Sequence, residues 1–380
     1  MTNQNALKDF FHTTTTQVNV DVKVPGKLYI SGEYAILFPQ QPAILIAVDQ
    51  YLRASITQSA KDQSGEIHTD LAELENLNFT IMDDQYDFAS NHSSGWLYVK
   101  NAMVVASELL SAMGIKLKSF KLTFHSNLVH DNGVKLGLGS SGAVVVATIK
   151  SLLAFHGIQA SNNLMIFKLA AIALIRSQSN GSLGDVAIIT HGGWVYYQSF
   201  DRQWLKHLLT KGDVSVSDLL LTDWPELMIE NLKPSDDLSL LIGWTQSAAS
   251  TESLVAKLLQ QVHNDDLFFK EFLTKSKESV NELRDAIVSN ELNQVQAEIQ
   301  TYRQLLQSLG EHYQISIETN LLTELIESAQ QFGYASKSSG AGGGDCGIAI
   351  GSKDLLTQPL IENWKQQGIL NLALQPTSQF

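Results

Sequence analysis

Residues 135–155 read KLGLGSSGAVVVATIKSLLAF, a loop of glycine and serine that leads directly into an apolar helix. At such a junction several backbone N–H groups and the positive end of the helix dipole point toward one spot. Glycine lets the backbone come close to an anion, and Ser140 or Ser141 can donate further hydrogen bonds or face a metal ion. A serine N-cap with glycines in a tight turn would leave the same letters. The stretch therefore predicts either a phosphate-binding loop or a capped turn, and the rest of the chain has to distinguish them.

Three phosphate-binding signatures fit the letters of this loop, and each fails on its context. Gly137, Gly139 and Gly142 spell G-x-G-x-x-G, but the dinucleotide fold needs an acidic residue about 20 positions on, and the first one here is Asp185. The P-loop requires a lysine where this chain has Ala143. The protein-kinase form requires H-R-D and D-F-G, which the sequence lacks. What remains is an anion-binding geometry shared by all three.

Composition and charge exclude several classes of protein. The chain has 380 residues and a formal net charge of −13, and its Lys and Arg are scattered singly, which disfavours nucleic acid as a partner. A single cysteine, Cys346, excludes an intrachain disulfide, and the histidines show no metal-ligand spacing. The first residues lack the pattern of a secretion signal, and no apolar window approaches the ~18 residues of a membrane span. We expect a soluble cytoplasmic protein that does not bind membranes.

The order of strands and helices predicts an α+β fold in two domains rather than repeating βα units. Strand-like alternation dominates residues 17–57, and helical spacing governs 95–113. We expect further strands at 120–125, 186–190, 193–199 and 238–244, and helices at 140–155, 162–178 and, with a break at Gly310, across 251–331. The expected domains are residues 1–215 and 216–380.

Two further stretches accompany the loop, in a fixed order. KVPGKLYISGEYAIL at 23–37 precedes it, and KSSGAGGGDCGIAI at 337–350 follows it, with NGSLGD at 180–185 between them. In this order they resemble the GHMP kinase superfamily, and their particular letters resemble its phosphomevalonate branch. The resemblance covers nearly the whole chain, from Lys23 to about Ile350. We call the three stretches the first, second and third motif.

The resemblance implies a fold and an activity. The fold is an N-terminal S5 domain 2-like domain and a C-terminal ferredoxin-like domain, with the active site between them. The activity is transfer of the γ-phosphoryl group of ATP, with Mg²⁺, onto the phosphate of mevalonate 5-phosphate, a step of isoprenoid synthesis. The partner would thus be a small-molecule substrate, and whether the protein is a monomer or a homodimer stays open.

The resemblance also assigns residues. Lys27 and Asp185 take the catalytic roles, and Ser141 supplies the hydroxyl that faces Mg²⁺. The ATP phosphates would lie against Lys135, Gly137, Leu138, Gly139, Ser140, Ser141, Gly142 and Ala143. The substrate would contact Lys27, Tyr34, Ser182, Ser250, Thr251, Ala341, Gly342 and Gly343. From the residue types alone, Lys27 also fits an exposed strand lysine, Asp185 a turn residue, and Ser250 a simple helix cap. We interpret Asp345 and Cys346 as structural.

A phosphate acceptor changes the task of the active-site carboxylate. The second pKa of a phosphate monoester is ~6, so the attacking oxygen is already largely anionic at neutral pH. We therefore expect Asp185 to orient Lys27 and the substrate rather than to remove a proton. Residues 143–184 contain no Asp or Glu, so the second magnesium ligand of some relatives is missing. Mg²⁺ would rest on nucleotide phosphates, Ser141, waters and, as one option, Asp185.

Two alternative functions share these motifs. Mevalonate kinase would carry all three, although its turn usually reads closer to P-S-G-x-D than to NGSLGD. A GHMP-fold sensor that binds ligands without turnover would tend to lose active-site residues, whereas Lys27, Asp185 and the loop serines are all present. The phosphomevalonate activity is the prediction that the sequence favours.

Overall fold

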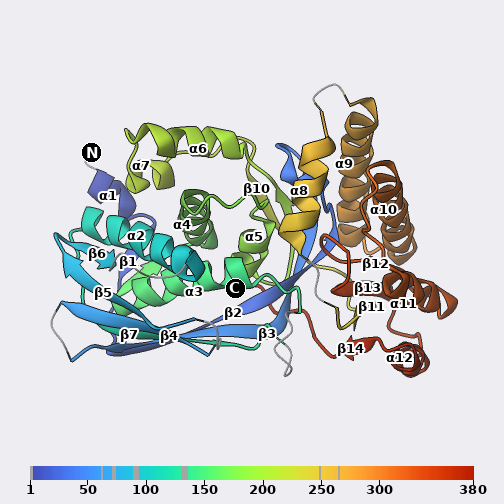
Figure 1. Cartoon of the computed structure of the whole chain (residues 1–380), viewed down its shortest axis with the longest axis horizontal. Coiled ribbons are helices and arrows are strands. Elements are labelled where there is room, and N and C mark those ends of the chain that lie inside the picture. The colour runs from blue at the N-terminus through green and yellow to red at the C-terminus, as the bar shows by residue number, and fades with distance from the viewer. Residues whose placement is uncertain are drawn as a thin grey trace.

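The structure is a computed structural model of the chain, and it describes residues 3–60, 63–70, 74–88, 94–129, 136–247, 250–263 and 266–380. Its two halves lie side by side, and each is built on its own mainly antiparallel sheet (Figure 1). The α+β architecture with two domains is confirmed.

An eight-stranded sheet carries the N-terminal half, in the order β10-β9-β3-β7-β4-β5-β6, with β2 paired to β3. The strand-like alternation of residues 17–57 forms two long strands, and a register shift between Pro25 and Gly26 lets the first of them, β2, continue past its proline. The strands are β2 (Asn19–Ser31), β3 (Pro42–Gln58), β4 (Ser64–Thr69), β5 (Leu77–Met82), β6 (Gln85–Phe88), β7 (Phe120–Ser126), β9 (Trp194–Gln198) and β10 (Met228–Leu232).

Helices cover one face of this sheet (Figure 1). The helix of the second motif, α3, packs on β2 and β3 and against α2, α4 and α5, so its N-terminus is fixed relative to the first motif. The remaining elements of this half are α1 (Asn3–Leu7), β1 (Phe11–Thr13), η1 (Ala35–Leu37), η2 (Ser94–Trp96), α2 (Leu97–Ala112), α3 (Ser140–Phe155), β8 (Ile158–Ala160), α4 (Asn163–Arg176), α5 (Gly184–His191), α6 (Arg202–Lys211) and α7 (Val216–Leu221); β1 and β8 pair with each other.

Two expectations about elements were wrong. The strand predicted at 186–190 is the helix α5, because a short, fully buried apolar run suits either element and the left-handed Leu183 (φ 66°) turns the chain into a helix. The break predicted at Gly310 is absent, since α10 continues through that glycine to His312. Ile315, just past the helix end, donates its N–H to the carbonyl of Gly310.

The C-terminal half has a four-stranded sheet in the order β12-β13-β11-β14, covered by helices. Its elements are β11 (Leu238–Trp244), α8 (Thr251–Gln261), α9 (Leu267–Val288), α10 (Leu292–His312), α11 (Asn320–Gln331), β12 (Ala335–Ser338), β13 (Cys346–Ser352), α12 (Thr357–Gln366) and β14 (Leu370–Leu372). Strand β10 pairs with β9 in the first sheet, and the second sheet begins with β11 at Leu238. The domain boundary predicted after residue 215 stays a prediction.

One hydrophobic core extends through both halves and fixes them against each other. It includes Leu28 and Ile44 of the large sheet together with Phe269 of α9 and Tyr302 of α10. At its edge Phe38 meets Phe269 edge to face, with ring centroids 4.8 Å apart. No helix in the described ranges is both long and apolar enough to span a bilayer.

Candidate active site

The first motif brings Lys27 to the loop of the second motif. The backbone N–H of Lys27 donates to the carbonyl of Leu138 at 3.0 Å, and its Nζ donates to the carbonyl of Gly137 at 2.9 Å. Burial lowers the pKa of this partly buried amine, and the charges of Asp185 and Asp345 oppose that effect. Lys27 is therefore a partly buried amine held in place beside the start of α3, not an exposed strand lysine.

The glycines of the loop are required because charged side chains lie where their Cβ atoms would be. A Cβ on Gly139 would lie 2.8 Å from Cγ of Lys27, and one on Gly142 would lie 2.5 Å from Oδ2 of Asp185. Gly139 is also the N-cap of α3, with φ 84°. This left-handed conformation favours glycine, which has no Cβ. The glycines therefore let the backbone approach Lys27 and Asp185 closely.

The two serines of the loop form the first turn of α3 rather than its cap. Ser140 is half-buried and Ser141 is exposed, so the hydroxyl of Ser141 faces outward at the helix N-terminus. Ala143, by contrast, is buried and donates its N–H to the carbonyl of Gly139 at 3.1 Å. Lys135, predicted to flank the loop, lies outside the described residues.

Asp185 sits at the N-termini of two helices at once. It is in the first turn of α5, and the backbone amides of Val186, of Asp185 itself and of Gly142 in α3 favour the anionic form of its carboxylate. Burial raises the pKa of Asp185, while Lys27 and these three amides act in the opposite direction. The amides and both helix dipoles favour a carboxylate that is anionic and fixed in orientation.

Ser182 is held in the turn before α5. Its Oγ lies 3.0 Å from the hydroxyl of Tyr29 and accepts the N–H of Gly184 at 3.2 Å, and its carbonyl accepts the hydroxyl of Tyr197 at 2.9 Å. Burial raises the pKa of Tyr29, and the charge of Asp185 adds to this. The aromatic ring of Tyr29 also lies 5.5 Å from Nζ of Lys27. Tyr29 thus connects the turn to the lysine.

The third motif joins the site from the C-terminal half. The hydroxyl of Tyr34 donates to the carbonyl of Ala341 at 2.6 Å, and the N–H of Gly343 donates to the carbonyl of Ile317 at 2.8 Å. Gly342 lies so close to Ile317 that a Cβ could not be accommodated. The backbone of the third motif is therefore fixed from both halves.

The two residues after this glycine run differ in their relation to the site. The carbonyl of Asp345 accepts the N–H of Thr245 at 2.9 Å, which supports the structural interpretation, but its carboxylate also reaches the loop. A Cβ on Gly137 would lie 2.8 Å from Oδ2 of Asp345. Cys346 is buried, its Sγ lies 3.5 Å from the carbonyl of Leu136, and burial raises the pKa of the thiol.

Ser250 and Thr251 lie at the start of α8, and both are exposed. Ser250 is the N-cap and accepts the N–H of Ser253 at 3.2 Å, as the simple capping interpretation expects. In the described ranges neither residue has a hydrogen bond to the other predicted site residues. Burial raises the pKa of Tyr98 in α2, and the negative charges of Glu252 in α8 and of Asp185 add to this.

Sequence reasoning missed Glu33, Lys337 and Arg202. The first two form a buried ion pair between the first and third motifs, within letters that were quoted for the resemblance. The guanidinium of Arg202 donates to the carbonyls of Asn180, Gly181 and Leu37, and so ties the NGSLGD turn to η1. No local pattern marks such residues, because their partners are far away in the sequence.

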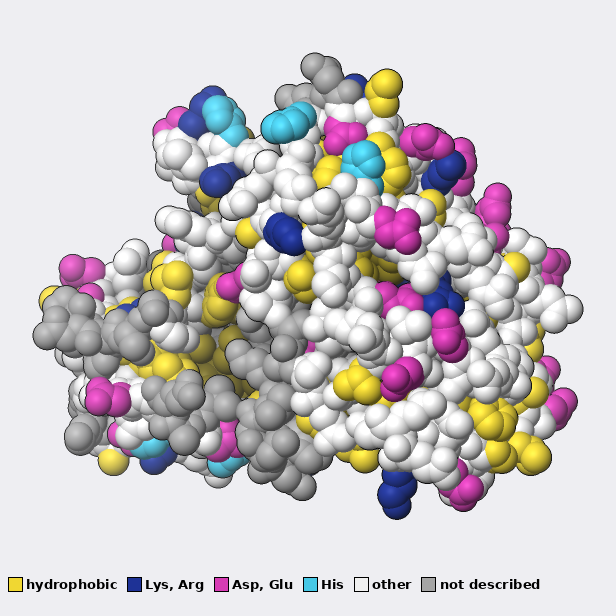
Figure 2. Space-filling view, turned by 45° about the vertical axis from the view of Figure 1, so that its right-hand side comes forward, with side chains coloured by type: hydrophobic (Ala, Val, Ile, Leu, Met, Phe, Trp, Pro, Cys, Tyr) yellow, Lys and Arg dark blue, Asp and Glu magenta, His cyan; other side chains and the backbone are white. Residues whose placement is uncertain are grey.

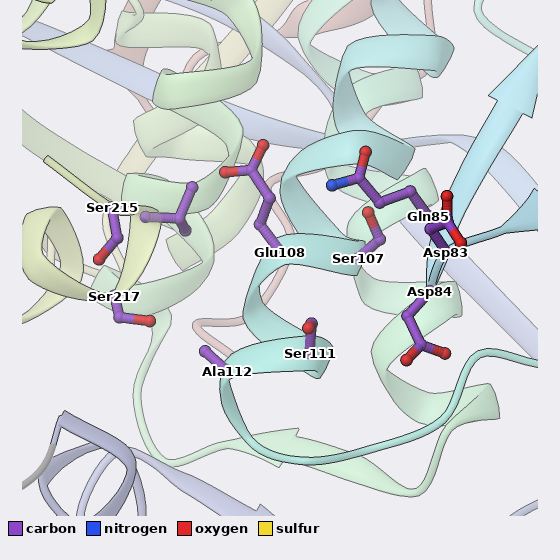
Figure 3. A pocket seen from close by; sticks show the side chains of 10 residues that line it. Asp83, Asp84, Gln85, Ser107, Glu108, Ser111, Ala112, Ser215 and Ser217 are labelled. Atoms are coloured by element: carbon purple, nitrogen blue, oxygen red, sulfur yellow. The ribbon is translucent and has the colours of Figure 1, made fainter. Parts of the chain in front are cut away.

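A separate cavity of about 330 Å³ lies between α2, α7 and the turn from β5 to β6 (Figure 3). Asp83, Asp84, Glu108 and several serines line it, and Glu108 is already paired with Arg176, at 2.5 Å. No predicted site residue lines this cavity. The described residues also contain no group of three His, Cys, Asp or Glu side chains arranged to hold a metal ion.

Basic side chains do not gather into a patch on the face of the molecule that Figure 2 shows. On the face shown in Figure 2, Lys and Arg side chains are scattered singly among more numerous acidic ones. This face therefore offers no extended basic patch, unlike the local donors at Lys27 and the N-terminus of α3.

Comparison with known proteins agrees with this geometry. The GHMP kinases N terminal domain family matches residues 98–193, and the GHMP kinases C terminal family matches residues 283–369. A phosphomevalonate kinase of Streptomyces sp. (strain CL190) is 34% identical over 376 residues, which are 96% of this chain and 98% of that protein. A mevalonate kinase of Thermococcus onnurineus is 25% identical over 338 residues, covering 88% of this chain and 89% of that protein.

A solved structure is similar over the same length. Streptococcus pneumoniae phosphomevalonate kinase in complex with phosphomevalonate and AMPPNP has a TM-score of 0.82 and 32% identity, covering 94% of this chain and 100% of that one. At this coverage the match includes both halves. The chain belongs to the GHMP kinase family, on its phosphomevalonate kinase branch.

Proposed function

We propose that this chain transfers the γ-phosphoryl group of ATP to the phosphate of mevalonate 5-phosphate, giving mevalonate 5-diphosphate and ADP. The observation that carries the proposal is the cluster of Lys27 and Asp185 at the N-terminus of α3, in a chain that matches phosphomevalonate kinases over almost its full length. Bound phosphomevalonate and AMPPNP in the Streptococcus pneumoniae relative support both the acceptor and the use of ATP.

The loop from Gly137 to Ala143 is the proposed cradle of the ATP phosphates. The amides at the start of α3 and the helix dipole favour negative charge there, and the close approach that glycine permits supplies direct backbone contacts.

Mg²⁺ fits this end of the site. It prefers oxygen ligands and retains several waters, and the exposed hydroxyl of Ser141 is the proposed protein ligand, with the partly buried carboxylate of Asp185 close to the same helix end. When bound, the ion would neutralise charge on the phosphates.

Lys27 and Asp185 are the proposed catalytic residues. One N–H of the Lys27 ammonium group is used by the carbonyl of Gly137, which leaves the others for the transferred phosphoryl group and the acceptor oxygen. A cation preorganised beside developing negative charge stabilises the transition state by several kcal/mol. Asp185 orients this cation through its charge while its own oxygens are held by amides.

The acceptor would lie between the turn before α5 and the third motif. Proposed contacts are the hydroxyls of Ser182 and Tyr34 and the backbone of residues 341–343, which the two halves hold together. Ser250 and Thr251 are proposed to receive the 5-phosphate at the N-terminus of α8, where exposed amides and the helix dipole favour an anion.

A coupled assay of ADP release tests the function directly. Purified protein with ATP and Mg²⁺ is offered mevalonate or mevalonate 5-phosphate in separate reactions. We expect turnover with mevalonate 5-phosphate and none with mevalonate. Turnover of mevalonate alone would make the protein a mevalonate kinase, and turnover of neither, with retained nucleotide binding, would make it a sensor.

A further inference from the structure

A buried ion pair joins the first motif to the third across the seam between the two halves. Glu33 follows β2, and Lys337 lies on β12; their side chains are 2% and 0% exposed, and Nζ of Lys337 contacts Oε1 of Glu33. Withdrawing two charges from water is costly, and an exposed pair would have avoided that cost. The pair is therefore a candidate for a role beyond stability.

Glu33 uses the same oxygen to hold the third motif in place. Oε1 also accepts the backbone N–H of Gly340 at 3.3 Å, while Lys337 donates to the carbonyl of Ser338 at 2.5 Å. The main chain of Glu33 is fixed separately, because its carbonyl accepts the hydroxyl of Tyr302 at 2.9 Å. Among the described residues Oε2 of Glu33 has no hydrogen-bond partner. Both hydrogen bonds of the Glu33 carboxylate are therefore made by Oε1.

The segment that this pair fixes is the one next to the reacting groups. Ser339 exchanges two hydrogen bonds with the main chain of Tyr29, at 3.0 and 2.8 Å, and Tyr34 bonds to the carbonyl of Ala341 at 2.6 Å. Lys27 lies in the same strand, two residues before Tyr29, and the charge of Glu33 is among those that act on the amine of Lys27. A displacement of Ser339–Ala341 would therefore be transmitted to the lysine and to the acceptor side.

We propose that Glu33 and Lys337 are positioning residues for phosphoryl transfer: their ion pair sets the position of Gly340 and Ala341 relative to Lys27. This inference rests on the proposed function. Phosphoryl transfer depends mainly on positioning, and a misplacement of about 1 Å costs about 10²-fold in rate. Both side chains are buried, so the pair acts through the backbone that it holds.

A double-mutant design separates positioning from stability. Glu33→Gln and Lys337→Met each leave a buried charge without its partner, so both should lower the melting temperature. The double variant Glu33→Gln/Lys337→Met has no unpaired charge and should recover most of that loss. We expect its kcat to stay at least about tenfold below wild type, with the KM for ATP changed less than about threefold.

Lys168→Met is the matched control. Lys168 is another buried lysine, 4% exposed, which donates to the carbonyls of Leu220 and Thr222 far from the motifs in sequence. Its loss should lower the melting temperature and leave kcat unchanged. A parallel fall of kcat in the control would show that destabilisation alone reduces activity, and would overturn the inference.

A double variant that melts like wild type and keeps wild-type kcat would also overturn it. If the Glu33 and Lys337 variants do not fold, Tyr302→Phe is the test. It keeps the ring and removes the hydroxyl, and with it the bond to the carbonyl of Glu33 and the contact with Oγ of Ser276. A kcat reduced about threefold or more supports positioning, and an unchanged kcat contradicts it. The ADP-release assay of the wild-type protein is done before the variants are compared. A wild type that is inactive with both acceptors refutes the proposed function, whereas an active wild type with unaffected variants refutes this inference alone.

Discussion

Lys27 and Asp185 have different chemical environments, and their substitution should have different effects. The carboxylate of Asp185 is held by the amides of residues 142, 185 and 186, as suits a group that orients its neighbours. Asparagine keeps a side-chain oxygen that can accept hydrogen bonds. The substrate phosphate that receives the phosphoryl group is already anionic, so Asp185→Asn should lose no more than about tenfold in kcat. Lys27→Met removes the cation beside the transferred group and should lose about 10³-fold. Steady-state kinetics with mevalonate 5-phosphate measures both; equal losses of about 10⁴-fold would instead identify Asp185 as a general base.

His156, at the end of α3, should make stability depend on pH. Its Nδ1 lies 2.8 Å from the carbonyl of Leu152 and its Nε2 accepts the N–H of Lys118 at 3.1 Å, so both ring nitrogens are engaged in the neutral form. Burial lowers the pKa of His156 to about 4, from an ordinary value of 6.5. The unfolded chain therefore binds the proton first as the pH falls.

The stability that neutral His156 contributes is present above pH 6.5 and is lost progressively toward pH 4. The free energy of unfolding should fall by about 2 kcal/mol between pH 7 and pH 5 from this group. Urea unfolding at both pH values measures it. His156→Gln should remove that part of the slope, and His207→Gln, a change at an exposed histidine of α6, should leave it intact. An equal slope in all three proteins would contradict the prediction.

At the scale of elements, the contact between α3 and α5 fixes the reacting centre. Alanine is normally the better helix former, so Gly142→Ala would be expected to stabilise an ordinary helix by about 0.5–1 kcal/mol. Here the new Cβ would lie 2.5 Å from Oδ2 of Asp185, and the carboxylate would have to move. We expect kcat to fall by about 10²-fold and stability to fall as well.

Gly212→Ala provides the comparison for this change. Gly212 follows α6 with φ 73° and has no atom within 4 Å of a built Cβ, so alanine there should cost about 1 kcal/mol of stability through the backbone alone. Its kcat should equal that of wild type. If Gly142→Ala kept full activity, the close approach of α3 to Asp185 would not matter for turnover.

The sequence predicted those elements whose signals are local. The glycine–serine loop and α3 follow from the letters of one stretch, and β2 and β3 follow from alternation, although the bulge that merges their pieces does not. The prediction of a strand at 186–190 was wrong. These residues are all buried, so the segment has no polar face whose spacing would indicate a helix. The Glu33–Lys337 pair was not predictable, since its partners are 304 residues apart and only the folded backbone brings them together.

At the scale of the whole molecule, the last residues return from the second sheet to the first. After β14 the chain reaches β3, where Gln375 and Asp49 exchange hydrogen bonds and the N–H of Thr377 donates to the carbonyl of Ala47 at 2.9 Å. The N–H of Phe380 donates to the carbonyl of His191, at the end of α5 opposite Asp185. Figure 1 shows the C-terminus among the N-terminal elements. We call residues 375–380 the return segment.

Deleting the return segment should destabilise the protein more than it impairs the chemistry. The deletion removes several backbone hydrogen bonds, each worth about 1 kcal/mol, so the free energy of unfolding should fall by a few kcal/mol. Asp185 keeps its own amide contacts, so kcat of the folded fraction should stay within about tenfold of wild type.

Calorimetry should show one transition at a lower temperature, because the shared core through α9 and α10 still couples the halves. Thr377→Val, which removes the hydroxyl that accepts the N–H of Gly193 and donates to the neighbouring carbonyl of Ser378, should give a much smaller shift. Two separated transitions after the deletion would mean that the return segment, rather than the shared core, is what makes the two halves unfold together.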